Sequence, residues 1–409
     1  PSWARRLASC SFTYGMPLYV DMATATTGIG WLKGISLCEV LIQGYDIQTC
    51  ALGAHSIGES MQASNAGIKL SIIVPCYKVE KYLPKCLDSL MAQTLEDIEV
   101  ICINDGSPDR CIDILNDYRD RFGSKIVVID KKNEGVWKGR WDGIAVAQGE
   151  YIGFIDSDDY TEPDFAESLY VAAKVADADI AVCGFERTDL ETGKVLSREL
   201  CDKRSGFVID GDEGRLVELN TAPWNKCFRA SVLKNMRNLT NPPTVLDDMA
   251  FHLLAYMDMH GRVVFTPKPL VHYMVREGSI INTVREEQID SILAAFLEIK
   301  GYYEAARPQM LPMLDAMAFL HLGVSLTFRL SCDERYDVKA ITDRFTAHLN
   351  QNFPTWSRSP YLEPAYVKKN GGAFKKLRFA QKVYKAGLMS TALSAYRFMI
   401  EKMHIDIKW

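Results

Sequence analysis

The feature that most constrains this fold is a repeated unit of one apolar strand followed by one amphipathic helix. The unit occurs four times between residues 69 and 176. The first begins with the apolar run "KLSIIV", after which Val79, Leu83, Leu87 and Leu90 recur at helical spacing. The other units are "IEVICIN" with a helix at 109–122, "KIVVID" with a helix at 136–148 and "EYIGFI" with a helix at 163–176. This alternation predicts an α/β fold with a doubly wound, mostly parallel sheet flanked by helices.

The rest of the chain follows other patterns. A strand is predicted at 179–185 and a hairpin turn at "ETGK" (191–194). Further on, we predict two short strands around "RVVFTPKPLVHYMV" and helices at 245–259, 283–306, 309–331 and 337–352. The predicted parts are an atypical N-terminal extension at 1–66 that is a leader or disordered, an α/β domain at 67–280 and a helical C-terminal region at 281–409.

Composition excludes several classes of protein. The chain has 409 residues, 48% of them hydrophobic, and a net charge of -5, so it can bury a large core and shows no global attraction to nucleic acid. Its 11 cysteines form neither a CxxC pair nor a zinc spacing, which predicts reduced thiols and a cytoplasmic location. The apolar run "AMAFLHLGVSLTF" (316–328) is shorter than a membrane span and contains His321, so we predict a buried core helix.

Polar clusters follow each of the four predicted parallel strands, where ligands bind in sheets of this kind. The clusters are "PCYK" (75–78), "NDGSPD" (104–109), "KKNEG" (131–135) and "DSDD" (156–159). Asp156 and Asp158 are two residues apart in an extended segment, so both can address one ligand, and two carboxylates suit Mn²⁺ or Mg²⁺ on a nucleotide diphosphate. Taken singly, these clusters have ordinary alternatives: an acidic turn that caps a helix, a tight turn, and a strand ended by proline.

Taken together, the motifs resemble inverting family 2 glycosyltransferases of the GT-A fold. The resemblance covers residues 69–280 and is carried by "SIIVPCYKVEKYL", "EVICINDGSPD", "GEYIGFIDSDDY" and "WNKCF…LDDMAF". It implies a nucleotide-sugar donor, UDP-linked in our interpretation, and as acceptor a hydroxyl of a glycan or a lipid-linked molecule, as in the synthesis of cell-surface polysaccharides.

The resemblance also implies roles for single residues. The donor-binding set is Pro75, Tyr77 and Glu80 at the nucleobase and ribose, Asp105 at the base, Arg140 after the third strand, Asp156, Ser157, and Arg276 over the diphosphate. Asp158, with Asp156, would bind Mn²⁺ or Mg²⁺. Asp248 would be the general base, the second acid of a pair at the head of a helix. Three positions depart from the family pattern: Lys78, Asp247 and Trp141, the last of which puts donor identity, or activity itself, in doubt.

The proposed chemistry is consistent with these residue types. Displacing a nucleoside diphosphate from a sugar with inversion needs a base near the incoming hydroxyl and positive charge on the leaving group. The helix N-terminus would keep Asp248 ionised, although ordinary N-capping is the alternative for the Asp247–Asp248 pair. Trp224 and Lys226 are interpreted either as packing and scaffold or as acceptor contacts.

The carboxyl end is basic. Residues 366–409 contain ten Lys or Arg and two acids, and Phe374, Leu377, Tyr384 and Leu388 recur at helical spacing among the lysines. This pattern is typical of an amphipathic helix on an anionic bilayer, which predicts peripheral attachment to the inner face of the membrane. The alternative is a terminal helix packed on the core with a solvated basic face.

Three other functions compete with this interpretation. A nucleotidyltransferase needs a glycine-rich phosphate loop after the first strand, where "PCYKVE" has no glycine, and an aspartyl phosphatase needs its D-x-D at the first strand rather than the fourth. A non-catalytic binding or scaffold protein with this fold is the remaining alternative. Trp141 favours it, whereas intact Asp158 and Asp248 count against it.

Overall fold

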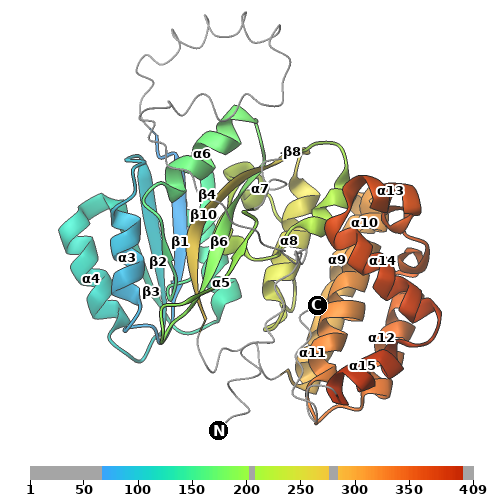
Figure 1. The fold of residues 1–409 in the computed structure, drawn as a ribbon. Coiled ribbons are helices and arrows are strands. Elements are labelled where there is room, and N and C mark those ends of the chain that lie inside the picture. The colour runs from blue at the N-terminus through green and yellow to red at the C-terminus, as the bar shows by residue number, and fades with distance from the viewer. Residues whose placement is uncertain (1–66, 202–207, 276–283, 399–409) are drawn as a thin grey trace, which may run out of the picture. The chain divides into compact units, whose positions relative to one another are not determined.

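The computed structural model describes residues 67–201, 208–275 and 284–398 (Figure 1). The predicted N-terminal extension at 1–66 lies outside the described residues. From Ile68 onward, the described chain forms one compact unit by its internal contacts.

Four parallel strands form the first half of the sheet, in the order β3-β2-β1-β4 (Figure 1). They are β1 (Leu70–Cys76), β2 (Ile98–Asp105), β3 (Ile126–Lys131) and β4 (Tyr151–Phe154). The helices that follow β1, β2, β3 and β4 are α3 (Leu83–Met91), α4 (Cys111–Phe122), α5 (Val136–Val146) and α6 (Phe165–Val175). The predicted four-unit repeat is therefore present, with element ends within a few residues of those expected.

The second half of the sheet is mixed. Its strands are β5 (Tyr160–Thr161), β6 (Ile180–Asp189), β7 (Val195–Glu199), β8 (Val208–Ile209), β9 (Lys226–Arg229) and β10 (Val263–Val275). β9 lies antiparallel between β4 and β6, and β10 runs parallel to β6 and antiparallel to β5 and β8. β6 and β7 form the predicted hairpin around residues 191–194.

The prediction of two short strands around 262–275 was wrong. The structure has one strand, β10, whose register against β6 shifts between Thr266 and Val271. Pro267 and Pro269 lie in this interval, and proline cannot donate a ladder hydrogen bond. Both prolines lie in an irregular part of β10, and the strand continues on either side of them.

The C-terminal half is helical, as predicted. It contains α7 (Ala230–Lys234), α8 (Asp247–Asp258), α9 (Glu286–Ala306), α10 (Leu311–Ala318), α11 (Thr327–Ser331), α12 (Val338–Asn352), α13 (Pro364–Asn370), α14 (Gly372–Lys385) and α15 (Met389–Phe398). A π-helical segment, Phe319–Leu326, joins α10 to α11. Within the described ranges, one helical stretch, Pro308–Ser331, is long and apolar enough to cross a membrane. Its apolar window is 78% buried inside the protein, and His321 is completely buried, which agrees with the predicted core helix.

The core has two large clusters, which follow the two faces of the sheet. Alternate residues of β1 serve different clusters: Ile73 belongs to one, and Ile72 and Val74 to the other. The cluster that contains Ile73 continues through Phe251 of α8 into Phe296 of α9 and the later helices. One apolar core therefore joins the sheet to the C-terminal helices.

The predicted membrane-facing side of the basic end needs correction. Phe374, Leu377 and Tyr384 of α14 are at most 7% exposed and belong to the core, and the Tyr384 hydroxyl donates a hydrogen bond to the Gly323 carbonyl. Leu388 alone among the four predicted residues is exposed, at 55%. The apolar side of α14 is thus already covered by protein, as in the core-packed alternative. Residues 399–409 lie outside the described residues.

Candidate active site

The loops after β1 and β2 are tied together at the carboxyl edge of the sheet. The Lys78 amide donates to Ser107 Oγ at 2.7 Å, and the Glu80 amide donates to Asp109 Oδ2 at 3.1 Å. Glu80 Oε2 in turn accepts from the Arg110 amide at 2.9 Å. Among the predicted nucleobase residues, Pro75 is partly buried and Tyr77 is 44% exposed. Glu80 therefore fixes a loop, while the ring of Tyr77 is partly exposed and has Lys78 Nζ 5.1 Å from its centroid.

Asp105 connects the end of β2 to the start of α5. It is 5% exposed, and its two carboxylate oxygens accept from the amides of Glu134 at 2.9 Å and Gly135 at 2.8 Å. Gly106 follows in a left-handed conformation (φ 61°), where a Cβ would lie 2.6 Å from the Asn133 nitrogen. The contacts of Asp105 in the structure hold the loop after β3; its predicted contact with a nucleobase stays a prediction.

The acidic triplet lies just after β4. Asp159 is 2% exposed, and its Oδ1 accepts from the Met274 amide of β10 at 2.7 Å. The Asp159 amide donates to the Asp156 carbonyl at 3.0 Å, which closes the turn, and Ser157 is buried inside it. Asp156 and Asp158 are partly exposed. The turn is thus fixed by Asp159, while Asp156 and Asp158 are only partly buried.

A buried arginine joins the acidic pair at the head of α8. Arg140 of α5 is 4% exposed, and its guanidinium lies 2.9 Å from Asp247 Oδ2 and 2.6 Å from Asp248 Oδ1. Helix α5, which carries Arg140, packs closely on the sheet at Gly143. A Cβ at that position would lie 2.7 Å from Ile73 Cγ2, so a larger residue would push the helix away. Arg140 was predicted to bind the donor; the structure brings it to the predicted general base, Asp248.

Negative charge is concentrated between these elements. Burial, then the charges of Asp248 and Asp158, raise the pKa of Asp156 to about 7, against the opposing effect of Arg140. Burial and the charge of Asp248 likewise raise the pKa of Asp247 to about 6. The site therefore has more carboxylate charge than one buried guanidinium neutralises, which favours a bound cation.

The donor atoms fit a hard divalent ion. Carboxylate oxygens such as those of Asp156 and Asp158 are typical Mg²⁺ and Mn²⁺ ligands. No group of three or more His, Cys, Asp or Glu side chains in the described ranges is arranged to hold a metal ion. In proteins Mg²⁺ is commonly bound by one or two carboxylates together with phosphate oxygens and water, and Asp156 and Asp158 could supply such carboxylates.

Comparison with known proteins identifies the family. The model of glycosyl transferase family 2 matches residues 71–237. The glycosyltransferase EpsH of Bacillus subtilis (strain 168) is 30% identical over 271 residues, which cover 63% of this chain and 76% of EpsH. The chain belongs to glycosyltransferase family 2.

Two further likenesses concern a longer relative and the fold. The poly(ribitol-phosphate) beta-glucosyltransferase of Bacillus spizizenii is 33% identical over 216 residues. The matched region covers 52% of this chain and 33% of the length of that relative. The crystal structure of S. aureus TarS 1–349 in complex with UDP-GlcNAc superposes with a TM-score of 0.57 at 19% identity, covering 78% of this chain and 92% of TarS 1–349. The GT-A-like α/β fold predicted from the sequence is confirmed.

Tyr273, which lies near the acidic triplet after β4, was not predicted from the sequence. The ring of Tyr273 on β10 stacks on Trp224 (centroids 5.3 Å apart, 19° between planes), and the Arg187 guanidinium lies 5.6 Å from the same ring. Burial, followed by the negative charge of Asp159, raises the pKa of Tyr273. Its hydroxyl therefore lies within electrostatic reach of the triplet. Alternation along a strand predicts that Tyr273 and Val271 point to the same face of the sheet. The pairing of β10 with β5, which brings this strand to the acidic triplet, is seen only in the fold.

Trp224 and Lys226, for which the sequence allows either a packing role or an acceptor contact, pack inside the protein. Trp224 is 6% exposed, and Lys226 is fully buried. Lys226 Nζ donates to Asn220 Oδ1 at 2.7 Å, the Ala222 carbonyl at 2.6 Å and Asn225 Oδ1 at 2.8 Å. Three acceptors match the three protons of an ammonium, although burial lowers the pKa of Lys226 to about 7. Lys226 therefore shapes the loop that places Trp224 beneath Tyr273.

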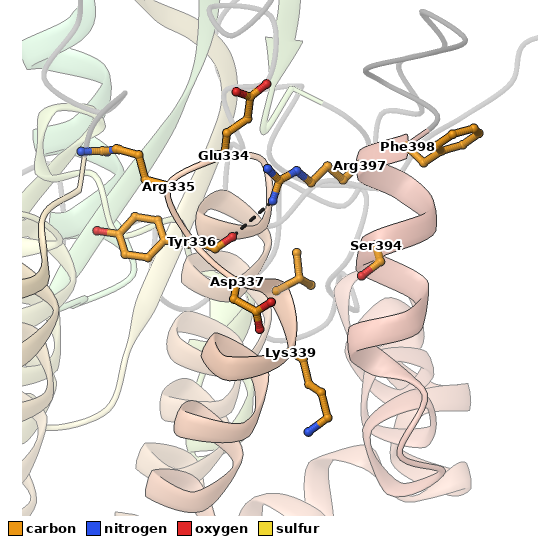
Figure 2. A pocket seen from close by; sticks show the side chains of 9 residues that line it. Glu334, Arg335, Tyr336, Asp337, Lys339, Ser394, Arg397 and Phe398 are labelled. Carbon is orange, nitrogen blue, oxygen red and sulfur yellow. Dashed lines mark hydrogen bonds between the residues drawn. The ribbon is translucent and has the colours of Figure 1, made fainter.

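Two predicted features do not join this constellation. Arg276 lies outside the described residues. Trp141 is partly buried, packs against the core and has its ring centroid 6.4 Å from that of Trp137. A pocket of about 540 Å³ lies elsewhere, between the start of α12 and α15 (Figure 2). Its cations are engaged by protein, since Arg335 pairs with Asp333, Lys339 with Asp343, and Arg397 donates to the Tyr336 carbonyl.

The raised carboxylate pKa values predict that the ligand-free enzyme loses stability as pH rises. Because the pKa of Asp156 is higher in the folded state, the native protein binds more protons than the unfolded chain between pH 4 and about 7. Protonated Asp156 therefore stabilises the folded state at low pH, and this stabilisation is lost as pH rises through that window. We expect Asp156→Asn to raise the Tm at pH 8 by roughly 2 °C in chelator, and to change it less at pH 5.5.

The control for this measurement is Asp120→Asn, which removes an exposed carboxylate paired with Arg119. We expect it to leave the pH dependence of Tm unchanged. An Asp156→Asn variant no more stable than the wild type at pH 8 would contradict the crowding of charge described above.

Proposed function

We propose that this family 2 protein is a metal-dependent inverting glycosyltransferase that transfers a hexosyl group from a UDP-linked donor to a hydroxyl of a glycan or lipid-linked acceptor. The observation that carries the proposal is the electrostatic interaction of Asp156, just after β4, with Asp158 and with Asp248 at the head of α8. The TarS complexes with UDP and UDP-GlcNAc, and the relative named as a poly(ribitol-phosphate) beta-glucosyltransferase, support a UDP-sugar donor and a polymeric acceptor.

Asp248 is proposed to remove the proton from the acceptor hydroxyl. The acceptor oxygen then forms a bond to the anomeric carbon as the bond from that carbon to the diphosphate oxygen breaks, which inverts the configuration. Arg140 orients the Asp248 carboxylate through their 2.6 Å contact. Bound Mn²⁺ or Mg²⁺ at Asp158 and Asp156 would supply positive charge to the departing diphosphate.

We further propose that different parts of the chain bind the donor and the acceptor. Residues 67–280 would bind the donor through Pro75, Tyr77, Asp105 and Ser157, with Arg276 over the diphosphate, and the helices after 281 would bound the acceptor side. Six of the eight cysteines among the described residues are buried in the core, as expected of reduced thiols, which supports a cytoplasmic location. A non-catalytic binding protein is the alternative, and donor hydrolysis or transfer would exclude it.

Donor binding is tested by thermal shift with UDP, UDP-GlcNAc, UDP-glucose, GDP and CDP, each with Mn²⁺, Mg²⁺ or chelator. A ligand at 100 times its Kd stabilises the folded state by about 2.7 kcal/mol. We expect a metal-dependent rise in Tm with the uridine nucleotides, and its loss in Asp158→Asn, because this variant removes a carboxylate that would hold the ion.

The matched control is Asp113→Asn, which neutralises a 62% exposed carboxylate on α4. It should retain the full shift. A shift that is equal in chelator and in Mn²⁺ would contradict metal dependence, and equal shifts for GDP and UDP would contradict the proposed uridine donor.

A further inference from the structure

The three last described helices form a segment of unusual charge. Residues 364–398 contain eight Lys or Arg and no Asp or Glu, whereas the whole chain has a net charge of -5. The remaining residues therefore hold 39 basic and 52 acidic side chains. Charge of one sign confined to one segment creates a local attraction for anions that the net charge conceals.

Most of the cations of this segment are exposed to solvent. Val367, Phe374, Leu377 and Tyr384 are buried, while Lys368, Lys369, Lys375, Lys382 and Lys385 are exposed. Within the described part of the chain, none of these five lysines forms an ion pair, and Lys385 donates one 3.3 Å hydrogen bond to the Ser357 carbonyl. Lysines elsewhere, such as Lys339 and Lys174, are paired with Asp343 and Glu150. The positive charge of these five lysines is therefore not neutralised by a carboxylate of the described residues.

Exposed apolar side chains accompany these lysines. Phe379 is 54% exposed, and Lys375 and Lys382 lie four residues before it and three residues after it, on the same side of α14. Phe398 is 57% exposed and Leu388 is 55% exposed in the same segment. Phe379 and Phe398 are the phenylalanines of the described residues that are more than half exposed. Solvation of a basic face explains exposed lysines but not exposed phenylalanines among them.

We propose that the outward face of α14, formed by Lys375, Phe379 and Lys382, docks this protein on an anionic lipid bilayer. Lysines at this face would contact lipid phosphates, and the aromatic ring would enter the interface between headgroups and acyl chains. The docking face is opposite to the one expected from the sequence, because Phe374, Leu377 and Tyr384 pack inward. An anionic polymer or nucleic acid would use the lysines without the ring, which makes Phe379 the discriminating residue.

The test is flotation of the full chain with vesicles of phosphatidylcholine alone, or of phosphatidylcholine and phosphatidylglycerol at roughly 7:3. We expect binding to the anionic vesicles at about 0.1 M salt, release at high salt, and none to the neutral vesicles. Lys375→Glu with Lys382→Glu should weaken binding at least tenfold, and Phe379→Ser should also weaken it at least fivefold.

The matched control reverses two exposed lysines elsewhere, Lys81→Glu with Lys194→Glu, and should bind as the wild type does. Wild-type protein that stays unbound to the anionic vesicles would overturn the proposal, as would equal weakening in the control. Full binding by Phe379→Ser would also overturn it, in favour of a charge-only surface. Nucleotide-induced thermal shifts in each variant report folding and donor binding separately, so failure here is distinct from failure of the proposed activity.

Discussion

Asp248→Asn is expected to lower kcat by roughly 10³-fold while the Kd for UDP changes by less than about twofold. The substitution keeps the size of the side chain and removes its ability to accept a proton from the acceptor. Asp248 is the better candidate of the pair because its side chain is 36% exposed, against 18% for Asp247. Turnover of a UDP-sugar with acceptor, together with calorimetry of UDP binding, measures the two quantities.

The neighbouring acid provides the control. Asp247→Asn removes the other partner of Arg140, and we expect kcat to fall by less than about tenfold, because this carboxylate orients rather than reacts. If Asp247→Asn loses turnover and Asp248→Asn keeps it, the base has been assigned to the wrong member of the pair. If UDP binding is lost in Asp248→Asn, the residue belongs to the donor site.

Arg140→Met is expected to destabilise the protein by about 3 kcal/mol and to abolish transfer. The guanidinium is 4% exposed and pairs with two carboxylates, so its removal leaves both acids close together without a cation. Chemical denaturation in chelator measures the free energy of unfolding. Adding Asp247→Asn and Asp248→Asn to the same chain should restore most of that free energy, since the uncompensated charges are then absent.

A surface pair shows what an ordinary ion pair contributes. Arg121→Met breaks the contact with Asp117, whose side chain is 64% exposed, and should lower the free energy of unfolding far less than Arg140→Met does, because water screens this pair. An Arg140→Met variant as stable as Arg121→Met would contradict the bridging role of Arg140 between α5 and α8.

The amino-acid sequence alone determined most of the local structure of this protein and the order of its motifs. Strand and helix periodicities are local, so β1 to β4 and the helices α4, α5, α6, α8, α9 and α12 were predicted within a few residues, whereas α7 was not predicted. The clusters that follow the strands were also foreseen, since the ends of parallel strands share one edge of a sheet. The family resemblance added Asp248 as the expected base, far along the chain.

Only the tertiary structure decided which groups meet. Arg140 and Asp247 are 107 residues apart, and no spacing in the sequence links them. The contact of Asp159 with the Met274 amide depends on the pairing of β5 with β10, which local periodicity does not encode. For α14, the sequence gives an amphipathic helix under either interpretation, and the neighbouring Gly323 and Phe319 decide that Tyr384 faces the core. Periodicity reports that a helix has an apolar side, but long-range packing selects what covers that side.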